Sequence, residues 1–257
     1  MEEVGKKSFI RKHWKIGLGG IILLSLAFAG ALEFLNPSGE SENPQFIQAD
    51  FIDLSRIDSI SKFRSGSGHD FSKGKGETCR SMKHYFNTKF SEDGQKLRDA
   101  NNNIPPGPDG ETDISIFSPV DGKIISVQKE KMPIGEQIYI RPDSKPTVTI
   151  RLFHIYLDDG FAKGTKVKAG EKIGKIGQYS NTDIALEKRG SGFISYFVAM
   201  PDSLFASYQA RGVKERSDLI ISKEYRDANP LQCNGENFAI NTDGDPNSGN
   251  FVTLSGK

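Results

Sequence analysis

The stretch from Phe117 to Gly177 places the strongest constraint on what this chain can fold into. Short runs rich in Val, Ile and Phe alternate there with polar residues, and Gly, Pro or Asp-Gly interrupts them every few positions. This pattern is typical of many short antiparallel strands joined by tight turns. It predicts a small barrel or sandwich, with strands over residues 123–128, 137–141 and 147–155.

Three motifs follow one another along this stretch. Pro119-Val120-Asp121-Gly122 opens the first expected strand, and Leu152-Phe153-His154-Ile155 ends the third. Glycine and aliphatic residues then recur at Gly164, Val167, Gly170, Ile173, Gly174 and Gly177. In this order the motifs resemble the β-core of lysostaphin-type (LytM-like) zinc metallopeptidases. The resemblance implies a divergent, degenerate member with an antiparallel β-sheet core, a barrel-sandwich hybrid of the duplicated hybrid motif type.

An apolar run near the amino terminus, residues 16–35, is long enough for a helix that crosses a bilayer. Residues 16–32 hold no charged side chain, and positive charges precede them at Lys6, Lys7, Arg11, Lys12 and Lys15. By the positive-inside rule, the amino terminus stays in the cytoplasm and the main domain is exported. A cleaved signal peptide is the alternative, since Ala27-Phe28-Ala29 resembles a cleavage site, but the length of the run favours an uncleaved signal-anchor.

The charge composition limits the classes of partner. The net charge is only +1, and neither a basic patch nor an acidic tail stands out, so no nucleic-acid partner is expected. The predicted organisation is a mainly β protein with one transmembrane helix and a small α/β C-terminal cap. Its parts are a cytoplasmic basic segment (1–15), the signal-anchor (16–35), a linker (36–45), the N-terminal part of the exported domain (46–113), the peptidase-like β-core (114–200) and the cap (201–257).

Only two cysteines are present, Cys79 and Cys233. In an oxidising compartment they can form one disulfide that joins the front of the exported domain to its tail. Two buried free thiols are the alternative. Sequence leaves both open, because it does not give the distance between the two residues.

The glycine-rich segment around Gly68-His69-Asp70 corresponds to the first zinc-binding motif of the family, H-x-x-x-D. His69 matches the histidine of that motif, but Lys73 stands where the carboxylate belongs, and a cation does not bind zinc. Asp70 and His84 are weaker replacement ligands. The alternative is structural, with His69 and Asp70 satisfying backbone groups in a turn.

The second zinc-binding motif, HLHFE in the family, falls on residues 183–187. Asp183 replaces the first histidine and can still bind a metal, whereas Ala185 replaces the second and cannot. His154 matches the histidine that positions or activates water, so it is the candidate catalytic residue. A hydrogen-bonded structural histidine is the alternative for His154.

The segments after the β-core have patterns of their own. Residues 192–200 are apolar and predict a strand, and residues 201–212 predict a helix with Asp202 or Ser203 as cap. Residues 218–222 indicate a short strand or a helical turn. Residues 241–249 carry oxygen ligands at alternate positions, but the closing Glu of a calcium loop is missing, so an ordinary turn is favoured.

The leading function hypothesis is a non-catalytic binding or scaffolding module at the cell envelope, with no cofactor. Near His154 and Asp183 it would hold an envelope peptide, a glycan or a partner protein, with Arg64 and Tyr179 as further binding residues. The alternative is a zinc metallopeptidase or amidase in which His69 and Asp183 bind the metal and His154 activates water. A plain interaction domain of the biotinyl-like barrel type is a third hypothesis.

Overall fold

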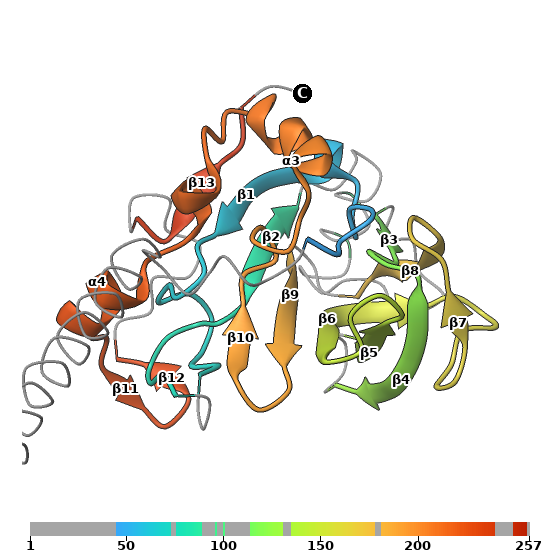
Figure 1. The fold of residues 1–257 in the computed structure, drawn as a ribbon, viewed down its shortest axis with the longest axis horizontal. Helices are drawn as coiled ribbons and strands as arrows, with labels where there is room; N and C mark the ends of the chain where they lie inside the picture. Colours follow the sequence, from blue (N-terminus) through green and yellow to red (C-terminus); the bar gives the residue numbers. More distant parts are fainter. Residues whose placement is uncertain are drawn as a thin grey trace, which may run out of the picture. The chain divides into compact units, whose positions relative to one another are not determined.

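Antiparallel strands dominate the computed structural model of this chain (Figure 1). It describes residues 45–72, 76–88, 96, 100, 114–130, 135–177, 181–239 and 249–255. The predicted basic segment, signal-anchor and nearly all of the linker lie outside these residues, as do Lys73, Tyr179 and residues 241–248. Among the described residues, no helix has both the length and the apolar character needed to cross a membrane.

The three strands predicted from alternation are present. They are β4 (Gly122–Lys129), β5 (Glu136–Pro142) and β6 (Val148–Leu157). Alternate side chains of β5 and of β6 as far as Leu152 are buried on one face, including Ile138, Ile140, Ile150 and Leu152, which are all 0% exposed. Because side chains alternate between the two faces of a strand, this spacing supplies the core and leaves the other face for polar and aromatic residues.

One sheet holds most of the strands, and its partners come from distant parts of the sequence. Its order is β13 (Phe251–Thr253), β1 (Ile57–Ser61), β2 (His84–Thr88), β9 (Asn181–Lys188), β6, β5, β4 and β7 (Lys166–Val167). Off this path, β10 (Gly192–Ile194) pairs with β9, and β8 (Lys172–Ile176) pairs with β6 and with β3 (Ser115–Phe117). All pairings between these strands are antiparallel.

Strand β6 changes partner at His154. It pairs with β9 as far as Phe153, which faces Asp183, and with β8 from Ile155 onward. The β5–β6 register shifts at the same place, and His154 has a φ of +61° in the left-handed region. The strand therefore carries a bulge at this residue.

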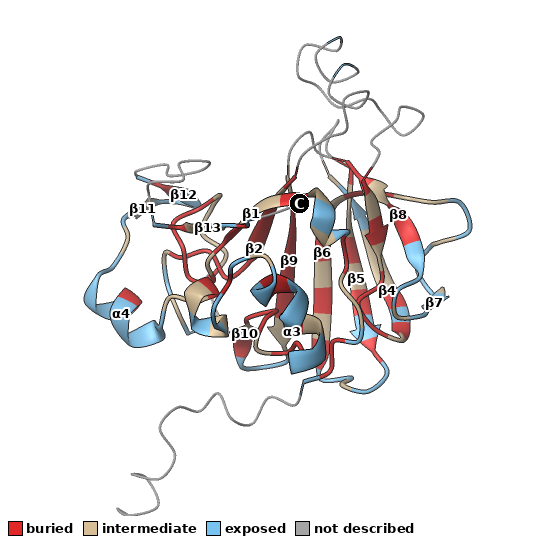
Figure 2. Cartoon of the chain, turned by 90° about the horizontal axis from the view of Figure 1, so that it is seen from above, coloured by how far each residue is buried: buried red, intermediate tan, exposed pale blue. Residues whose placement is uncertain are grey.

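The carboxyl-terminal part contains the predicted helix. It is α3 (Asp202–Gln209), which buries Phe205 and Tyr208, although its N-cap position is Pro201 and no side chain caps it. A helical turn, η2 (Arg216–Leu219), covers the start of the segment 218–222, and Ile220 after it is extended and forms an isolated bridge with Phe63, so each alternative holds for part of the segment. Helix α4 (Lys223–Ala228) follows, and most residues of α3 and α4 are exposed, as their colouring in Figure 2 shows.

The prediction of a strand over residues 192–200 is only partly correct. Strand β10 ends at Ile194, because the hydroxyl of Ser195 accepts the N–H of Phe197 at 3.2 Å and turns the chain. The apolar residues beyond it, including Tyr196 and Phe197, are fully buried in the core, so they are apolar without being extended.

The tail does more than cover the β-core. Strand β13 pairs with β1, with Val252 opposite Ile60, and forms one edge of the main sheet. Strand β1 itself comes from the segment before the β-core. Residues on both sides of the core in sequence therefore build one continuous sheet with it.

Candidate functional site

The site is built on the face of β2, β6 and β9 that points away from the core residues Ile184 and Leu152. Tyr85 and Phe153 are both register partners of Asp183, so the three side chains lie on the same face. Lys83 is two residues before Tyr85 and shares that face. The alternation of side chains therefore brings Lys83, which directly precedes β2, next to Asp183 of β9.

Four charged side chains form an alternating row, called here the charged cluster. Lys83 Nζ lies 2.5 Å from Asp183 Oδ2, and His154 Nε2 lies 3.1 Å from Asp183 Oδ1. On its other side, His154 Nδ1 donates a hydrogen bond of 2.7 Å to Glu130 Oε2. The His154–Asp183 contact is an ion pair whose N–H is not aligned for a hydrogen bond. The charges alternate in sign, so the row as a whole is neutral.

Burial and charge act against each other in this row. Burial alone would raise the pKa of Asp183, but the charges of Lys83 and His154 outweigh it and lower the pKa to about 2. Burial alone would lower the pKa of His154, but Asp183 and Glu130 outweigh it and raise the pKa to about 9. His154 is therefore an imidazolium at neutral pH, which has no lone pair with which to take a proton from water.

The bulge in β6 aims His154 at the two carboxylates. Its neighbours Leu152 and Ile155 are core residues, while Phe153 and His154 both contact groups of the site face. The backbone N–H of His154 also donates to Glu130 Oε2, at 3.1 Å. A left-handed histidine in a strand is a strained conformation, and such strain is found most often at functional sites.

Aromatic rings surround the Lys83 ammonium. Its Nζ lies 3.9 Å from the centroid of Phe153, 4.6 Å from that of Phe71 and 5.2 Å from that of Tyr85. The ring faces attract the cation and replace some of the water that it loses on burial. Lys83 is 2% exposed, and the Asp183 carboxylate and these rings are its surroundings.

A second cation occupies the neighbouring position on the same face. Ala185 is opposite Arg151 in the β6–β9 ladder. The guanidinium of Arg151 lies 4.8 Å from the Tyr139 centroid and 4.9 Å from that of Phe71, and its Nη2 donates to Gln137 Oε1 at 2.9 Å. The side chain beside Ala185 on this face is therefore the Arg151 guanidinium.

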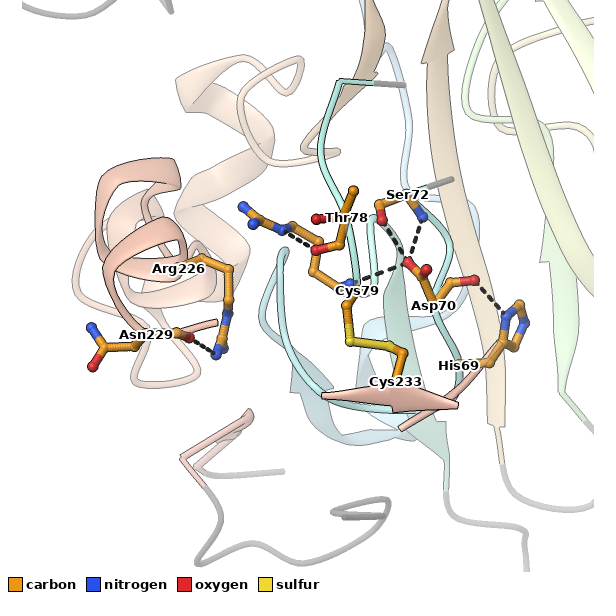
Figure 3. Close-up of a disulfide and its surroundings, with 9 residues drawn as sticks. His69, Asp70, Ser72, Thr78, Cys79, Arg226, Asn229 and Cys233 are labelled. Carbon is orange, nitrogen blue, oxygen red and sulfur yellow. Dashed lines mark hydrogen bonds between the residues drawn. A yellow bond between two sulfur atoms is a disulfide. The ribbon is translucent and has the colours of Figure 1, made fainter. Parts of the chain in front are cut away.

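The loop with His69 and Asp70 lies beside this face and is shaped by its own hydrogen bonds (Figure 3). Asp70 Oδ1 accepts from Ser72 N at 3.0 Å, from Ser72 Oγ at 2.5 Å and from Arg80 N at 3.1 Å. His69 Nδ1 donates to the Asp70 carbonyl at 3.2 Å. Burial and the Lys83 ammonium lower the pKa of His69. These contacts of Asp70 are those of the turn alternative.

His84 is on the opposite face of β2 from Lys83 and Tyr85. Its Nδ1 contacts the Ser61 carbonyl at 2.8 Å and its Nε2 contacts Ser195 Oγ at 2.8 Å. Burial lowers the pKa of His84 to about 4, so the ring is neutral. Both ring nitrogens have protein partners, and the residue is placed to hold β1 and the turn after β10 together.

Arg64, predicted as a binding residue, is engaged elsewhere. It forms a two-point ion pair with Glu77, with distances of 2.7 and 3.1 Å, and donates to the Ile221 carbonyl at 3.2 Å. Its guanidinium is therefore tied to the loop before Cys79 and to the segment after η2.

The two cysteines form a disulfide, Cys79–Cys233, across 154 residues of sequence. The disulfide joins the loop of His69 to a hairpin made of β11 (Cys233–Asn234) and β12 (Asn237–Phe238) (Figure 3). His69 forms a bridge with Asn237, and Asp70 N donates to the Glu236 carbonyl at 2.7 Å. The disulfide alternative is confirmed, and the bond anchors the hairpin beside His69.

A zinc ion does not fit these residues. Among the described residues, no group of three or more His, Cys, Asp and Glu side chains is placed to hold a metal ion. A zinc ion bound to Asp183 would stand next to the Lys83 ammonium and the His154 imidazolium, and close like charges repel strongly at a buried site. No catalytic step through zinc follows from this arrangement.

Sequence reasoning missed Lys83 and Glu130. Lys83 precedes His84 and Tyr85 in a segment whose polar–apolar alternation indicates a strand. That pattern does not indicate which residue Lys83 pairs with. Glu130 follows β4 in a run of charged residues without a motif. Only the strand register, which sequence does not supply, brings them to Asp183 and His154.

The chain matches no protein-family model and no curated protein in sequence. It is similar to solved structures of LytM-like and lysostaphin-type peptidase-fold proteins. One is titled "Structure of the SpoIIQ-SpoIIIAH pore forming complex", with 13% identity, 66% of this chain and 98% of that chain covered, and a TM-score of 0.41.

Two other similar structures are a zinc containing peptidase from Vibrio cholerae and lysostaphin. The peptidase has 17% identity, 58% of this chain and 39% of that chain covered, and a TM-score of 0.37. For lysostaphin the values are 14%, 52%, 52% and 0.31. This chain therefore spans about two fifths of the peptidase and half of lysostaphin. Because every TM-score is below 0.5, no property of these proteins is transferred to the site.

Proposed function

We propose that this chain is a non-catalytic binding or scaffolding module of the cell envelope with a duplicated hybrid motif core. A signal-anchor over residues 16–35 holds it in the membrane, with the described domain on the outer side. The face around His154 and Asp183 binds an envelope peptide, a glycan or a partner protein.

The observation that carries this proposal is the Lys83–Asp183 ion pair. The side chains of Lys83 and Asp183 are 2% and 0% exposed. Lys83 therefore supplies the positive charge that the buried Asp183 carboxylate needs. The Lys83 ammonium occupies the position beside Asp183 that a metal ion would take, and its charge removes the electrostatic attraction of this carboxylate for a metal. His154 is held protonated by its carboxylate neighbours, so it does not act as a general base.

The partly exposed residues around the cluster suit binding. Phe71, Tyr139, Arg151 and Phe193 are each partly exposed, and the Phe71 ring lies 5.0 Å from the Phe193 ring. Arginine and aromatic side chains dominate the energetics of binding surfaces, because they bury large area and donate directed hydrogen bonds. The charged cluster contacts this surface through Lys83, whose Nζ lies 4.6 Å from the Phe71 centroid.

Metal content and hydrolysis distinguish a binding module from an enzyme. The full chain is purified, its zinc is measured by mass spectrometry, and it is incubated with purified peptidoglycan sacculi. We expect no stoichiometric zinc, co-sedimentation with the sacculi and no release of soluble fragments. Arg151→Ala should weaken co-sedimentation, while the matched control Arg189→Ala, at an exposed turn, should not.

A zinc peptidase or amidase with relocated ligands is the second candidate, favoured by the position of His69 beside the face that carries Asp183 and His154. One zinc per chain that is lost in His69→Ala, together with release of fragments, would establish this candidate and refute the binding module. Absence of both binding and hydrolysis would leave a partner protein as the ligand class to test.

A further inference from the structure

A pocket lies between the end of β1, the segment after η2 and helix α4, and it shares no lining residue with the charged cluster. Its volume is about 530 Å³, within the range of small-ligand sites. Its walls include Lys62, Ile220, Ile221, Ser222, Tyr225 and Arg226. We call it the α4 pocket.

Arg226 is a buried cation in the wall of this pocket, and only 7% of its surface is exposed. Its Nε donates to the Arg64 carbonyl at 2.9 Å. Its Nη1 donates to the Asn229 carbonyl at 3.2 Å (Figure 3). Both acceptors are neutral. Within the described part of the chain, Nη2 has no hydrogen-bond acceptor and no carboxylate pairs with the guanidinium.

The acidic side chains of this region are committed to other cations. Glu77 binds Arg64 and Arg80, and Asp227 binds Arg80 and Lys223. Burial and the like charge of Arg80 lower the pKa of Arg226, which shows that its surroundings do not favour the charge. A buried guanidinium without a counter-ion is costly, and an anionic ligand would relieve that cost.

The remaining walls define what accompanies the anion. Lys62 is partly exposed, and its ammonium contacts no carboxylate of the described residues, so it adds a second positive charge. Ile220 and Ile221 give an apolar wall, and Tyr225, which is 59% exposed, presents a ring at the edge. Such a pocket suits an anionic group attached to an apolar one.

We propose that the α4 pocket binds a carboxylate that carries a small apolar group, the chemistry of the free carboxyl terminus of a peptide. Arg226 Nη2 and the Lys62 ammonium hold the carboxylate, and Tyr225 with Ile221 packs against the last side chain. A guanidinium N–H donates a charge-assisted hydrogen bond to a carboxylate oxygen, and the apolar walls would be left uncovered by a bare inorganic anion. This binding is independent of the function proposed for the His154 face.

Three probes test the pocket on the full chain by isothermal titration and NMR shift mapping. They are N-acetyl-trialanine with a free carboxyl terminus, the same peptide with a carboxamide terminus, and inorganic phosphate. The free acid should bind about tenfold more tightly than the amide, the difference expected for one charge-assisted contact. Equal affinity of acid and amide, or no binding of either, would overturn the proposal. Tighter binding of phosphate than of the free acid would overturn it too, and would assign the pocket to phosphate.

Matched variants connect the binding to the named residues. Lys62→Glu should weaken the free acid about tenfold or more, whereas Lys163→Glu, the same charge change at an exposed lysine outside the pocket, should leave it unchanged. Tyr225→Ala should weaken acid and amide alike, because it removes apolar contact only. Arg226→Lys should lose the preference for the acid while thermal melting shows that it still folds. An unaltered affinity in Lys62→Glu would refute the assignment even if Arg226→Lys does not fold.

Discussion

Lys83 and Asp183 are buried together, and the removal of one partner leaves the other charge without compensation. We expect Lys83→Met to lower the free energy of unfolding by about 3–5 kcal/mol, the loss typical of a broken buried ion pair. The measurement is urea denaturation followed by circular dichroism.

An exposed pair provides the control for this change. Lys172 lies 3.2 Å from Asp158, with side chains that are 49% and 36% exposed, so Lys172→Met should cost less than about 1 kcal/mol. The double change Lys83→Met with Asp183→Leu should recover much of the stability, because both charges are then gone. A loss in Lys83→Met no larger than in Lys172→Met would contradict the role assigned to the pair.

Two histidines give the fold an optimum in pH. The folded pKa of His154 is raised from 6.5 to about 9, so its stabilisation is complete below pH 6.5 and is lost as the pH rises through 9. The folded pKa of His84 is lowered from 6.5 to about 4, so its contribution is present above pH 6.5 and is lost as the pH falls through 4. Each limb corresponds to about 3 kcal/mol, and the melting temperature should be highest near pH 6.5.

His154→Gln separates the two limbs. The variant should be less stable at pH 6.5 and should lose the decline between pH 6.5 and 9, while the acid limb set by His84 stays. Melting curves across this range check the prediction. An alkaline limb that persists unchanged in His154→Gln would show that another group causes it.

Motif matching placed His154 and Asp183 at one site, but it did not find the residues that pair with them. His154 and Asp183 were predicted at one site and lie in one ion pair. His84, which was predicted as a weak metal ligand, points to the face of β2 opposite the site. Neighbouring residues of a strand point to opposite faces, and Lys83 is the one on the site face. Contacts that span 100 residues, as between Lys83 and Asp183, leave no local pattern.

At the scale of elements, the disulfide fixes the β11–β12 hairpin to the loop of His69. A crosslink across 154 residues removes much of the freedom of the unfolded chain, and its loss typically costs about 2–5 kcal/mol. We expect the variant Cys79→Ser with Cys233→Ser to show this loss in denaturation, and hydrogen exchange of Asp70 N–H to accelerate, because that group donates to Glu236 in the hairpin.

Reduction of the unchanged protein is the matching control. Dithiothreitol should reproduce both effects in the wild-type chain and have none on the double serine variant. Equal exchange of Asp70 with and without the disulfide would mean that the other contacts of the hairpin hold it in place alone.

Alternation and turn residues predicted the elements of the β-core well. Strands β4, β5 and β6 follow the expected residues, because buried and more exposed positions alternate over most of β5 and over β6 before the bulge. The apolar run 192–200 misled for a physical reason: residues 195–197, 199 and 200 are buried without alternation, and such burial does not distinguish a strand from a turn in the core. The bulge at His154 has no sequence signal either, since non-glycine residues seldom adopt positive φ.

At the scale of the whole molecule, the apolar run 16–35 lies outside the described residues and stays a prediction. The full chain expressed in bacteria should sediment with membranes, and Cys79 and Cys233 should resist maleimide until a reductant is added, because only an exported domain meets an oxidising compartment. Deletion of residues 16–35 should leave both thiols reactive in the soluble fraction. Thiols that react without reductant in the intact chain would place the domain in the cytoplasm.

Sequence order concealed how the parts join into one sheet. Strands β1 and β2 lie in the predicted N-terminal part of the exported domain and β13 lies in the predicted cap, and all three extend the sheet beyond β9. Pairings between such distant segments depend on three-dimensional closure, which periodicity does not report. The predicted boundaries at residues 113 and 201 therefore divide the sequence but not the sheet.

The left-handed backbone of His154 makes that position a marker for reading related sequences. Glycine would relieve the conformational strain there at no steric cost, so a histidine is worth keeping only while its imidazolium bridges the two carboxylates. In kindred chains that have lost Glu130 or Asp183, glycine should replace this histidine. A histidine that persists in such chains would show that the two ion pairs are not what retains it.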